Sequence, residues 1–213
     1  MRVFILCAGR TGSTTIIRAF GHATNFTAGH ESRADRIVAR CEYPDQHIEA
    51  DNRLVWFLGT LERLYGDAPL YVHLTRDRRA VVESHLARWN AAVARSRPAW
   101  LLRHPRMLAG RARRWLRDPE STRYPSIVRG LGREVIIRPG VFSEEDRRQV
   151  CELFVQTVED NIEAFLAGKP NVEHVAVESF ADDVKRLWHR IGAEGDLDAA
   201  LAELEVRHNR YLS

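Results

Sequence analysis

The feature that most constrains this sequence is an apolar run that stops in a glycine loop and continues as a helical pattern. Residues 2–8 (RVFILCA) are almost continuously apolar, which is typical of a strand buried on both faces of a parallel sheet. After the loop, residues 13–23 (STTIIRAFGHA) have the pattern of a helix that Ser13 or Thr14 caps. A strand–loop–helix unit of this kind points several backbone N–H groups at one spot, which favours phosphate binding.

The same order of strand, turn and helix returns further along the chain. Residues 70–75 (LYVHLT) predict a second buried strand, and Asp77 is placed to cap the helix after it. Residues 143–168 predict a long amphipathic helix, and residues 172–180 a further strand. Strands that alternate with helices favour an α/β fold, a parallel sheet between two layers of helices. We expect a single domain over 1–213, with a helical or irregular insertion near 90–142 and a polar, irregular stretch over 32–52.

The glycine loop lacks the lysine that marks cradles for nucleoside triphosphates. In ATP- and GTP-cleaving enzymes the loop reads G-x-x-x-x-G-K-[ST], and its lysine reaches the β- and γ-phosphates. Here Ser13 follows Gly12, and the positive charge stands two residues before that glycine, at Arg10. This cradle suits one phosphate better than a triphosphate with magnesium. Taken alone, the loop also fits an ordinary Gly/Ser/Thr turn.

A second candidate phosphate site follows the second strong strand. Arg76 stands at the carboxyl end of that strand, the edge at which open α/β sheets bind ligands. Ser84 stands eight residues later, about two helical turns on. An arginine fork and a hydroxyl can together hold a second phosphate. Taken separately, the two residues also fit a surface arginine and an ordinary helix serine.

Together the two segments resemble the nucleotide-binding motifs of sulfotransferases that use 3′-phosphoadenosine-5′-phosphosulfate (PAPS). RTGST is similar to the family's first motif, which grips the 5′-phosphosulfate, and VHLTRDRRAVVES to the second, which holds the 3′-phosphate. The resemblance implies a P-loop NTPase-like fold, PAPS as co-substrate and its desulfated form PAP as product, without metal. The tail VRHN resembles a loop that closes over the nucleotide in many members. The nucleotide-binding residues that the resemblance implies are Arg10, Thr11, Gly12, Ser13, Thr14, Arg76, Ser84 and Arg207.

Sulfuryl transfer requires charge stabilisation on the leaving oxygen and a base for the acceptor's proton. Arg10 and Thr14 are expected to stabilise the oxygen. Glu31 lies in the first loop after the cradle helix and is the candidate base, with His30 as its rival. The stretch GHES that contains both residues also fits a solvated turn.

Composition limits the class of protein without identifying the acceptor. The net charge of +3 suits a small polyanion and does not require a nucleic acid. The three cysteines have no metal-ligand spacing, and Cys7 is expected to be a buried, unreactive thiol. No apolar stretch approaches the roughly 20 residues that cross a bilayer, and the first residues are too short for a signal-peptide core. We therefore expect a cytoplasmic protein that binds no metal.

Several alternatives remain open at this point. The acceptor can be a carbohydrate, a lipid, a peptide or a small alcohol or amine, and the oligomeric state is unknown. Arg-rich residues 97–117 fit a wall for an anionic acceptor, a membrane-surface patch or a solvated basic face. Residues 47–53 (HIEADNR) fit an acceptor entrance or a polar connection that Asp51 or Asn52 caps. A small-molecule P-loop kinase and a non-catalytic RNA- or polyanion-binding protein are the alternative functions.

Overall fold

The structure, a computed structural model, describes residues 1–95 and 143–206. The chain divides into two compact units. The first unit consists of Met1–Val81 and Gln156–Ser213, and the second of Val82–Val155. The expected Arg-rich helix over 97–117, the loop-like insertion up to 142 and Arg207 lie outside the described residues.

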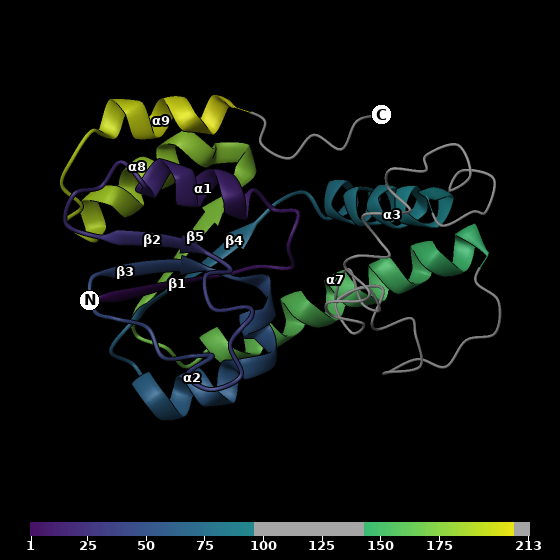
Figure 1. Cartoon of the computed structure of the whole chain (residues 1–213), viewed down its shortest axis with the longest axis horizontal. Coiled ribbons are helices and arrows are strands. Elements are labelled where there is room, and N and C mark those ends of the chain that lie inside the picture. The colour runs from purple at the N-terminus through teal and green to yellow at the C-terminus, as the bar shows by residue number, and fades with distance from the viewer. Residues whose placement is uncertain (96–142, 207–213) are drawn as a thin grey trace, which may run out of the picture. The chain divides into compact units, whose positions relative to one another are not determined.

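The first unit is built on a sheet of five parallel strands, in the order β2-β3-β1-β4-β5. The strands are β1 (Arg2–Leu6), β2 (Thr27–His30), β3 (His47–Ala50), β4 (Leu70–Thr75) and β5 (Val172–Ala176). Helices flank this sheet (Figure 1), so the expected α/β class with a parallel sheet is confirmed. Both strong sequence predictions of strands, over 2–8 and 70–75, correspond to neighbouring central strands, β1 and β4.

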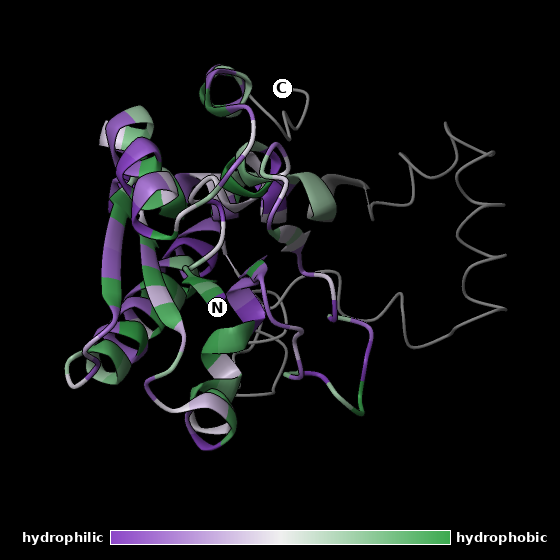
Figure 2. Ribbon diagram, turned by 90° about the vertical axis from the view of Figure 1, so that its left-hand side faces the viewer, coloured by the Kyte–Doolittle hydropathy of each residue, from purple (hydrophilic) through white to green (hydrophobic). Residues whose placement is uncertain are grey.

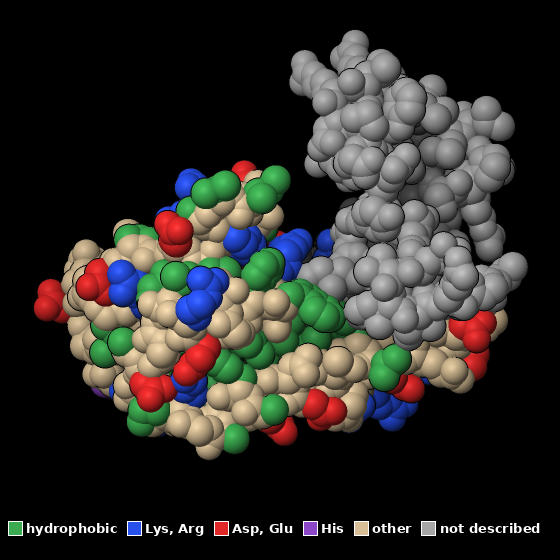
Figure 3. All heavy atoms as spheres, turned by 90° about the horizontal axis from the view of Figure 1, so that it is seen from below, with side chains coloured by type: hydrophobic (Ala, Val, Ile, Leu, Met, Phe, Trp, Pro, Cys, Tyr) green, Lys and Arg blue, Asp and Glu red, His purple; other side chains and the backbone are tan. Residues whose placement is uncertain are grey.

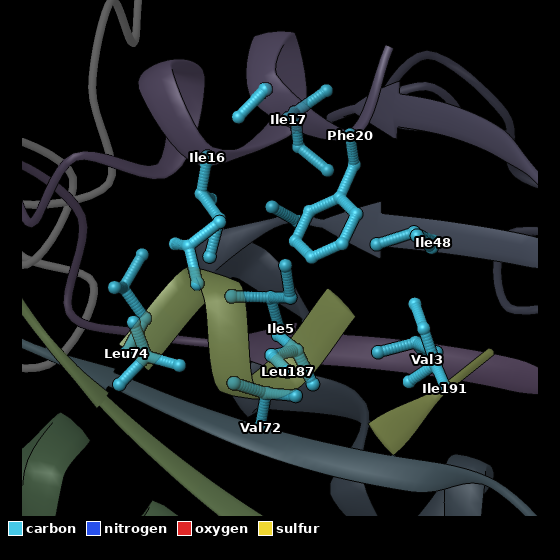
Figure 4. Close-up of a cluster of buried hydrophobic side chains, with 14 of the residues drawn as sticks. Val3, Ile5, Ile16, Ile17, Phe20, Ile48, Val72, Leu74, Leu187 and Ile191 are labelled. Carbon is cyan, nitrogen blue, oxygen red and sulfur yellow. The ribbon is translucent and has the colours of Figure 1, made fainter. Parts of the chain in front are cut away.

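Three helices cover one face of the sheet: α1 (Ser13–Phe20), α8 (Phe180–Arg190) and α9 (Leu197–Glu205) (Figure 1). Figure 4 shows side chains of α1 and α8 meeting those of the strands on this face. Phe20 of α1 stacks on Trp188 of α8 with ring centroids 5.7 Å apart. Burial of this apolar cluster, at about 25 cal/mol per Å² of surface removed from water, holds the layers together.

The other face of the sheet is packed with aromatic rings. The ring centroid of Phe4 lies 5.4 Å from those of Tyr43 and Tyr65 and 5.9 Å from that of Tyr71. Tyr65 belongs to α2 (Leu58–Tyr65), which follows the 3₁₀ helix η1 (Asn52–Phe57). Because β1 is buried on both faces, its sequence is apolar without alternation, as a central parallel strand requires.

Strand β3 corrects the expectation of an irregular segment over 32–52. His47–Ala50 pair in parallel with β1 on one side and β2 on the other. All four residues are buried, although two of them, His47 and Glu49, are polar. The two side chains satisfy each other, since His47 Nε2 lies 3.0 Å from Glu49 Oε2. A hydropathy pattern cannot reveal this strand, because its polar partners are found only in the folded protein.

The predicted helix caps are partly right. Asp77 caps α3 (Arg78–Arg95), because its Oδ1 accepts the N–H of Ala80 at 2.8 Å. The expectation that Ser13 or Thr14 caps α1 is wrong, since Gly12 is the N-cap. A glycine has no side chain that could accept from the first N–H groups of α1, which matters for the site below.

The described part of the second unit is helical. It holds the later part of α3 and the first part of α7 (Glu144–Leu166). Ser143 and Asp146 form the predicted capping box at the start of α7, with bonds of 3.0 Å and 2.7 Å between each side chain and the other residue's N–H. The rings of His85 and Phe154 meet edge to face, with centroids 5.4 Å apart.

The helices carry hydrophilic and hydrophobic bands in Figure 2, as expected for helices with one face on a core. No helix among residues 1–95 and 143–206 combines the length and the apolar character needed to span a bilayer.

The buried Cys7 makes the protein less stable at alkaline pH. Burial raises the pKa of its thiol to about 11, whereas a thiol in an unfolded chain titrates near 8.5. Between these values the unfolded chain releases the proton and the folded protein keeps it, so the free energy of unfolding falls as pH rises. We expect a loss of about 1–2 kcal/mol between pH 8.5 and pH 10 from this thiol, measured by urea unfolding. The Cys7→Ala variant should show a shallower slope, and identical slopes would contradict the assignment.

Candidate functional site

The carboxyl ends of the five strands meet at one edge of the sheet because all strands are parallel. Ligands of open α/β sheets bind at this edge, where the loops diverge from a central strand. The polar and charged residues near the carboxyl ends of the strands include Arg10, Ser13, Thr14, His30, Glu31, Asp51, Asn52, Arg53, Arg76 and Glu178.

The loop after β1 is wound by three residues in the left-handed region of backbone space. Gly9 has φ of 74°, Arg10 of 63° and Gly12 of 85°. Arg10 is not a glycine, so its conformation costs about 1 kcal/mol and is held by the surrounding structure. A Cβ at Gly9 would also lie 2.7 Å from Nδ2 of Asn52, so the end of that side chain would have to move. Left-handed residues of this kind occur in the anion-binding nests that successive backbone N–H groups form.

The start of α1 adds a partial positive charge to this loop. Gly12 is its N-cap and has no side chain to cap the helix. The N–H groups of the first turn and the helix dipole favour an anion at this point by about 0.3–1 kcal/mol at an exposed site, and by more where solvent is excluded. We call Gly9–Thr14 the cradle.

Arg76 reaches the cradle from the neighbouring strand. Its Nη1 donates to the carbonyl oxygen of Arg10 at 3.2 Å, and its side chain is exposed. The turn that carries Arg76 is fixed on its other side, since Glu178 Oε1 accepts the N–H of Asp77 at 2.7 Å. The predicted meeting of the loop and this arginine therefore occurs in the first unit. Ser84, its predicted partner, is half-buried on the part of α3 that belongs to the second unit.

His30, the last residue of β2, lies against the hydroxyl groups of the cradle. Its Nε2 is 3.0 Å from Ser13 Oγ and 3.3 Å from Thr14 Oγ1. The sequence proposed His30 as a base and the two hydroxyl residues as ligand contacts, and the fold brings all three together. A ring nitrogen in this place can orient both hydroxyl groups toward a bound anion.

Glu31 follows directly and has its own charged partner. Its φ of 52° is left-handed, and its N–H donates to the carbonyl of Ala50 at 3.0 Å. Its Oε2 lies 2.5 Å from Nη1 of Arg53. The contact is an ion pair by distance without the alignment of a hydrogen bond, and the Glu31 side chain is 32% exposed. The Glu31 carboxylate is therefore accessible from solvent.

Thr11 has a different environment from its neighbours in the cradle. Thr11 is fully buried. Its Oγ1 makes no aligned hydrogen bond among the described residues. It nevertheless lies close enough to the Cys7 thiol to act toward a lower pKa of that group. A ligand above the loop can therefore use the backbone of Thr11 rather than its side chain. The Oδ1 of Asn52, beside Gly9, is also buried without a hydrogen bond in the described part of the chain.

Asp51 has a structural role rather than one at an entrance for the acceptor. It is fully buried, caps η1 through the N–H of Arg53 at 2.8 Å and pairs with the guanidinium of Arg40. Burial acts to lower the pKa of Arg40, but the adjacent Asp51 outweighs it and the pKa is raised. Of the two caps that the sequence offered, Asp51 and Asn52, Asp51 is the one that caps the following helix, as expected for a connection before a helix.

Two further observations concern metals and charge. Among the described residues, no group of three or more His, Cys, Asp or Glu side chains is arranged to hold a metal ion. Figure 3 shows Lys and Arg side chains interspersed with Asp and Glu on the face that it draws.

Contacts in this region that sequence patterns missed include those of Asn52 with Gly9, Arg53 with Glu31, and Glu49 with Ser32. The signal available for the contact of Glu49 with Ser32 was the polar–apolar alternation of residues 47–50, which fits a strand as well as a connection.

Comparison with models of known families, with characterised proteins and with solved structures finds no match to this chain.

Proposed function

We propose that this chain is a sulfotransferase that moves the sulfuryl group of PAPS to a hydroxyl or amine group of an acceptor. The observation that carries the proposal is the cradle: three left-handed residues, a helix start with glycine at its N-cap and Arg76 converge at the end of β1. The sheet order and the position of the cradle between β1 and α1 support a P-loop NTPase-like fold.

The charges at the site suit single phosphates better than a triphosphate. PAPS carries one phosphate bonded to sulfate at its 5′ end and a separate 3′-phosphate. The cradle offers backbone donors and Arg10 for the phosphosulfate, and Arg76 offers a guanidinium for the 3′-phosphate. No lysine follows Gly12, so the residue that reaches the β- and γ-phosphates in triphosphate cradles is missing.

The transfer itself requires in-line attack and charge stabilisation. The acceptor oxygen or nitrogen forms a bond to sulfur while the bond from sulfur to the bridging 5′-phosphate oxygen breaks, which leaves PAP. The acceptor's proton goes to Glu31, the proposed base, and the charge on the leaving oxygen is stabilised by Arg10 and Thr14. His30 orients the hydroxyl groups of Ser13 and Thr14 in this scheme, which its two contacts support.

Calorimetric titration with PAP tests the proposal. We expect micromolar binding that is the same in EDTA and in magnesium, because two single phosphates need no bridging cation. Adenosine 5′-phosphate, which lacks the 3′-phosphate, should bind more weakly. An absence of heat with PAP would contradict the proposal, and magnesium-dependent binding of ATP would favour a kinase instead. Salt-sensitive RNA binding without a response to PAP would favour a polyanion-binding protein.

A further inference from the structure

A buried carboxylate in the middle of the sheet lies next to the proposed base. Glu49 of β3 is fully buried, and a buried carboxylate is stable only when donors surround it. Its Oε1 accepts the N–H of Ser32 at 2.8 Å, and its Oε2 accepts the hydroxyl of Ser32 at 2.6 Å. The Glu49 carboxylate thus accepts two hydrogen bonds from Ser32, the residue that follows Glu31.

A second side chain fixes the carboxylate from the other side. His47 Nε2 lies 3.0 Å from Glu49 Oε2, and its Nδ1 lies 2.7 Å from the hydroxyl of Thr27. Because a carboxylate only accepts, Nε2 of His47 donates to Glu49, while Nδ1 lies within hydrogen-bond distance of the Thr27 hydroxyl. The series of side-chain contacts Thr27–His47–Glu49–Ser32 therefore connects the start of β2, strand β3 and the turn after β2.

The backbone of β2 leaves room for this arrangement only because residue 29 is glycine. A Cβ at Gly29 would lie 2.5 Å from Glu49 Oε2 and 2.9 Å from Cβ of Ser32. No real Cβ makes contacts this close, so any other residue here would displace the carboxylate or the turn. Gly29 needs no left-handed backbone, so its absent side chain serves close packing.

The turn held in this way is the one that presents Glu31. Glu31 has a left-handed φ of 52°, which is unfavourable for a non-glycine residue. Three anchors hold it: the Glu31 N–H on the Ala50 carbonyl at 3.0 Å, the Ser32 bonds to Glu49, and the ion pair of Glu31 with Arg53. All three partners lie on β3 or just after it, so one strand sets the position of the carboxylate.

We propose that Glu49 and Ser32 form a clamp that makes Glu49 a positioning residue for the base Glu31, an inference that rests on the proposed sulfotransferase function. Glu49 is fully buried and does not touch the acceptor. It acts by keeping the Glu31 carboxylate at the distance that proton transfer requires, because small displacements of a base cost much of its effect.

The full-length protein with Ser32→Ala or Glu49→Gln tests the clamp. Amide exchange of Glu31 and Ser32, followed by NMR, should be roughly tenfold faster in both variants because a charge-assisted bond is lost or weakened. The maximal rate of PAP release from PAPS, with phenol or water as acceptor, should fall by about tenfold, while the affinity for PAP and the KM for PAPS stay within about twofold. Ser32→Thr keeps the hydroxyl and should restore both readouts.

Two matched controls separate the clamp from general loss of bonds. Thr24→Ala removes a hydroxyl that donates to the Glu194 carbonyl at 3.2 Å, and Glu62→Gln neutralises a carboxylate paired with Lys169. Neither should change exchange at Glu31 or the release of PAP.

The possible results distinguish the two proposals. Unchanged exchange at Glu31 and Ser32 in both variants would overturn the clamp, whether or not the protein binds PAP. Faster exchange with an unchanged rate of PAP release would overturn the positioning role. A wild-type protein that neither binds PAP nor releases it from PAPS would overturn the proposed function, and with it the role of Glu31 as base, while exchange still reports on the clamp.

Discussion

Replacing Arg76 with alanine is expected to weaken PAP binding at least a hundredfold in calorimetric titrations. The Arg76 side chain is exposed at the end of β4, where its Nη1 already reaches the backbone of the cradle. A bound 3′-phosphate would cover this side chain, and loss of one partner of a buried hydrogen-bonded charge pair costs about 2–5 kcal/mol, at a factor of ten in affinity for each 1.4 kcal/mol. Because the residue is exposed, the free energy of unfolding should stay within about 0.5 kcal/mol of the wild-type value.

The controls for this prediction use the same side chain. Arg18→Ala removes an exposed arginine from the last turn of α1, away from the cradle, and should leave the PAP affinity unchanged. Arg76→Lys should recover part of the affinity, since lysine keeps the charge and loses the planar fork. Wild-type affinity in Arg76→Ala would show that the 3′-phosphate is held elsewhere.

The Glu31→Gln variant is expected to bind PAP normally and to transfer sulfate about 10²–10⁴ times more slowly. This range is the usual contribution of a general base, and glutamine keeps the shape of the side chain without accepting a proton. The maximal rate of PAP release from PAPS is the measurement, with calorimetry of PAP binding beside it. Because Glu31 is one-third exposed and forms its ion pair with the similarly exposed Arg53, little stability should be lost.

His30→Ala provides the contrast that decides between the two candidate bases. His30 contacts the hydroxyl groups of Ser13 and Thr14, so its loss should weaken PAP binding as well as turnover. If His30→Ala instead keeps full affinity and loses turnover, while Glu31→Gln remains active, the roles are reversed. The structure gives the two adjacent residues different contacts: His30 lies against the cradle hydroxyl groups and Glu31 beside Arg53.

Local patterns were sufficient for the elements that depend on local physics. The unbroken apolar runs predict β1 and β4, because a central parallel strand buries both faces. The caps at Asp77 and Ser143 follow from side-chain oxygens that bond N–H groups three residues away. The strand–loop–helix unit itself predicts a cradle from residues that are adjacent in the chain.

Features that depend on distant partners could not be read in the same way. The hydropathy pattern does not predict strand β3, because His47 and Glu49 are polar. Only the fold shows that Thr27 and Ser32 supply hydrogen-bond partners for these two side chains. The sequence did not predict Gly12 as the N-cap of α1, because the neighbouring Ser13 and Thr14 are the usual capping residue types. The curvature of the loop places Gly12 at the N-cap position.

The amino-acid order is enough to establish a parallel α/β unit, a glycine cradle without lysine and an arginine one strand away. Side-chain chemistry and spacing along the chain contain that information. The contacts of His30 with the cradle, of Arg53 with Glu31 and of Glu49 with Ser32 arise only after β2 and β3 pair. They join residues 16 to 22 positions apart through strand register, and no local pattern in the chain specifies which strand lies beside which.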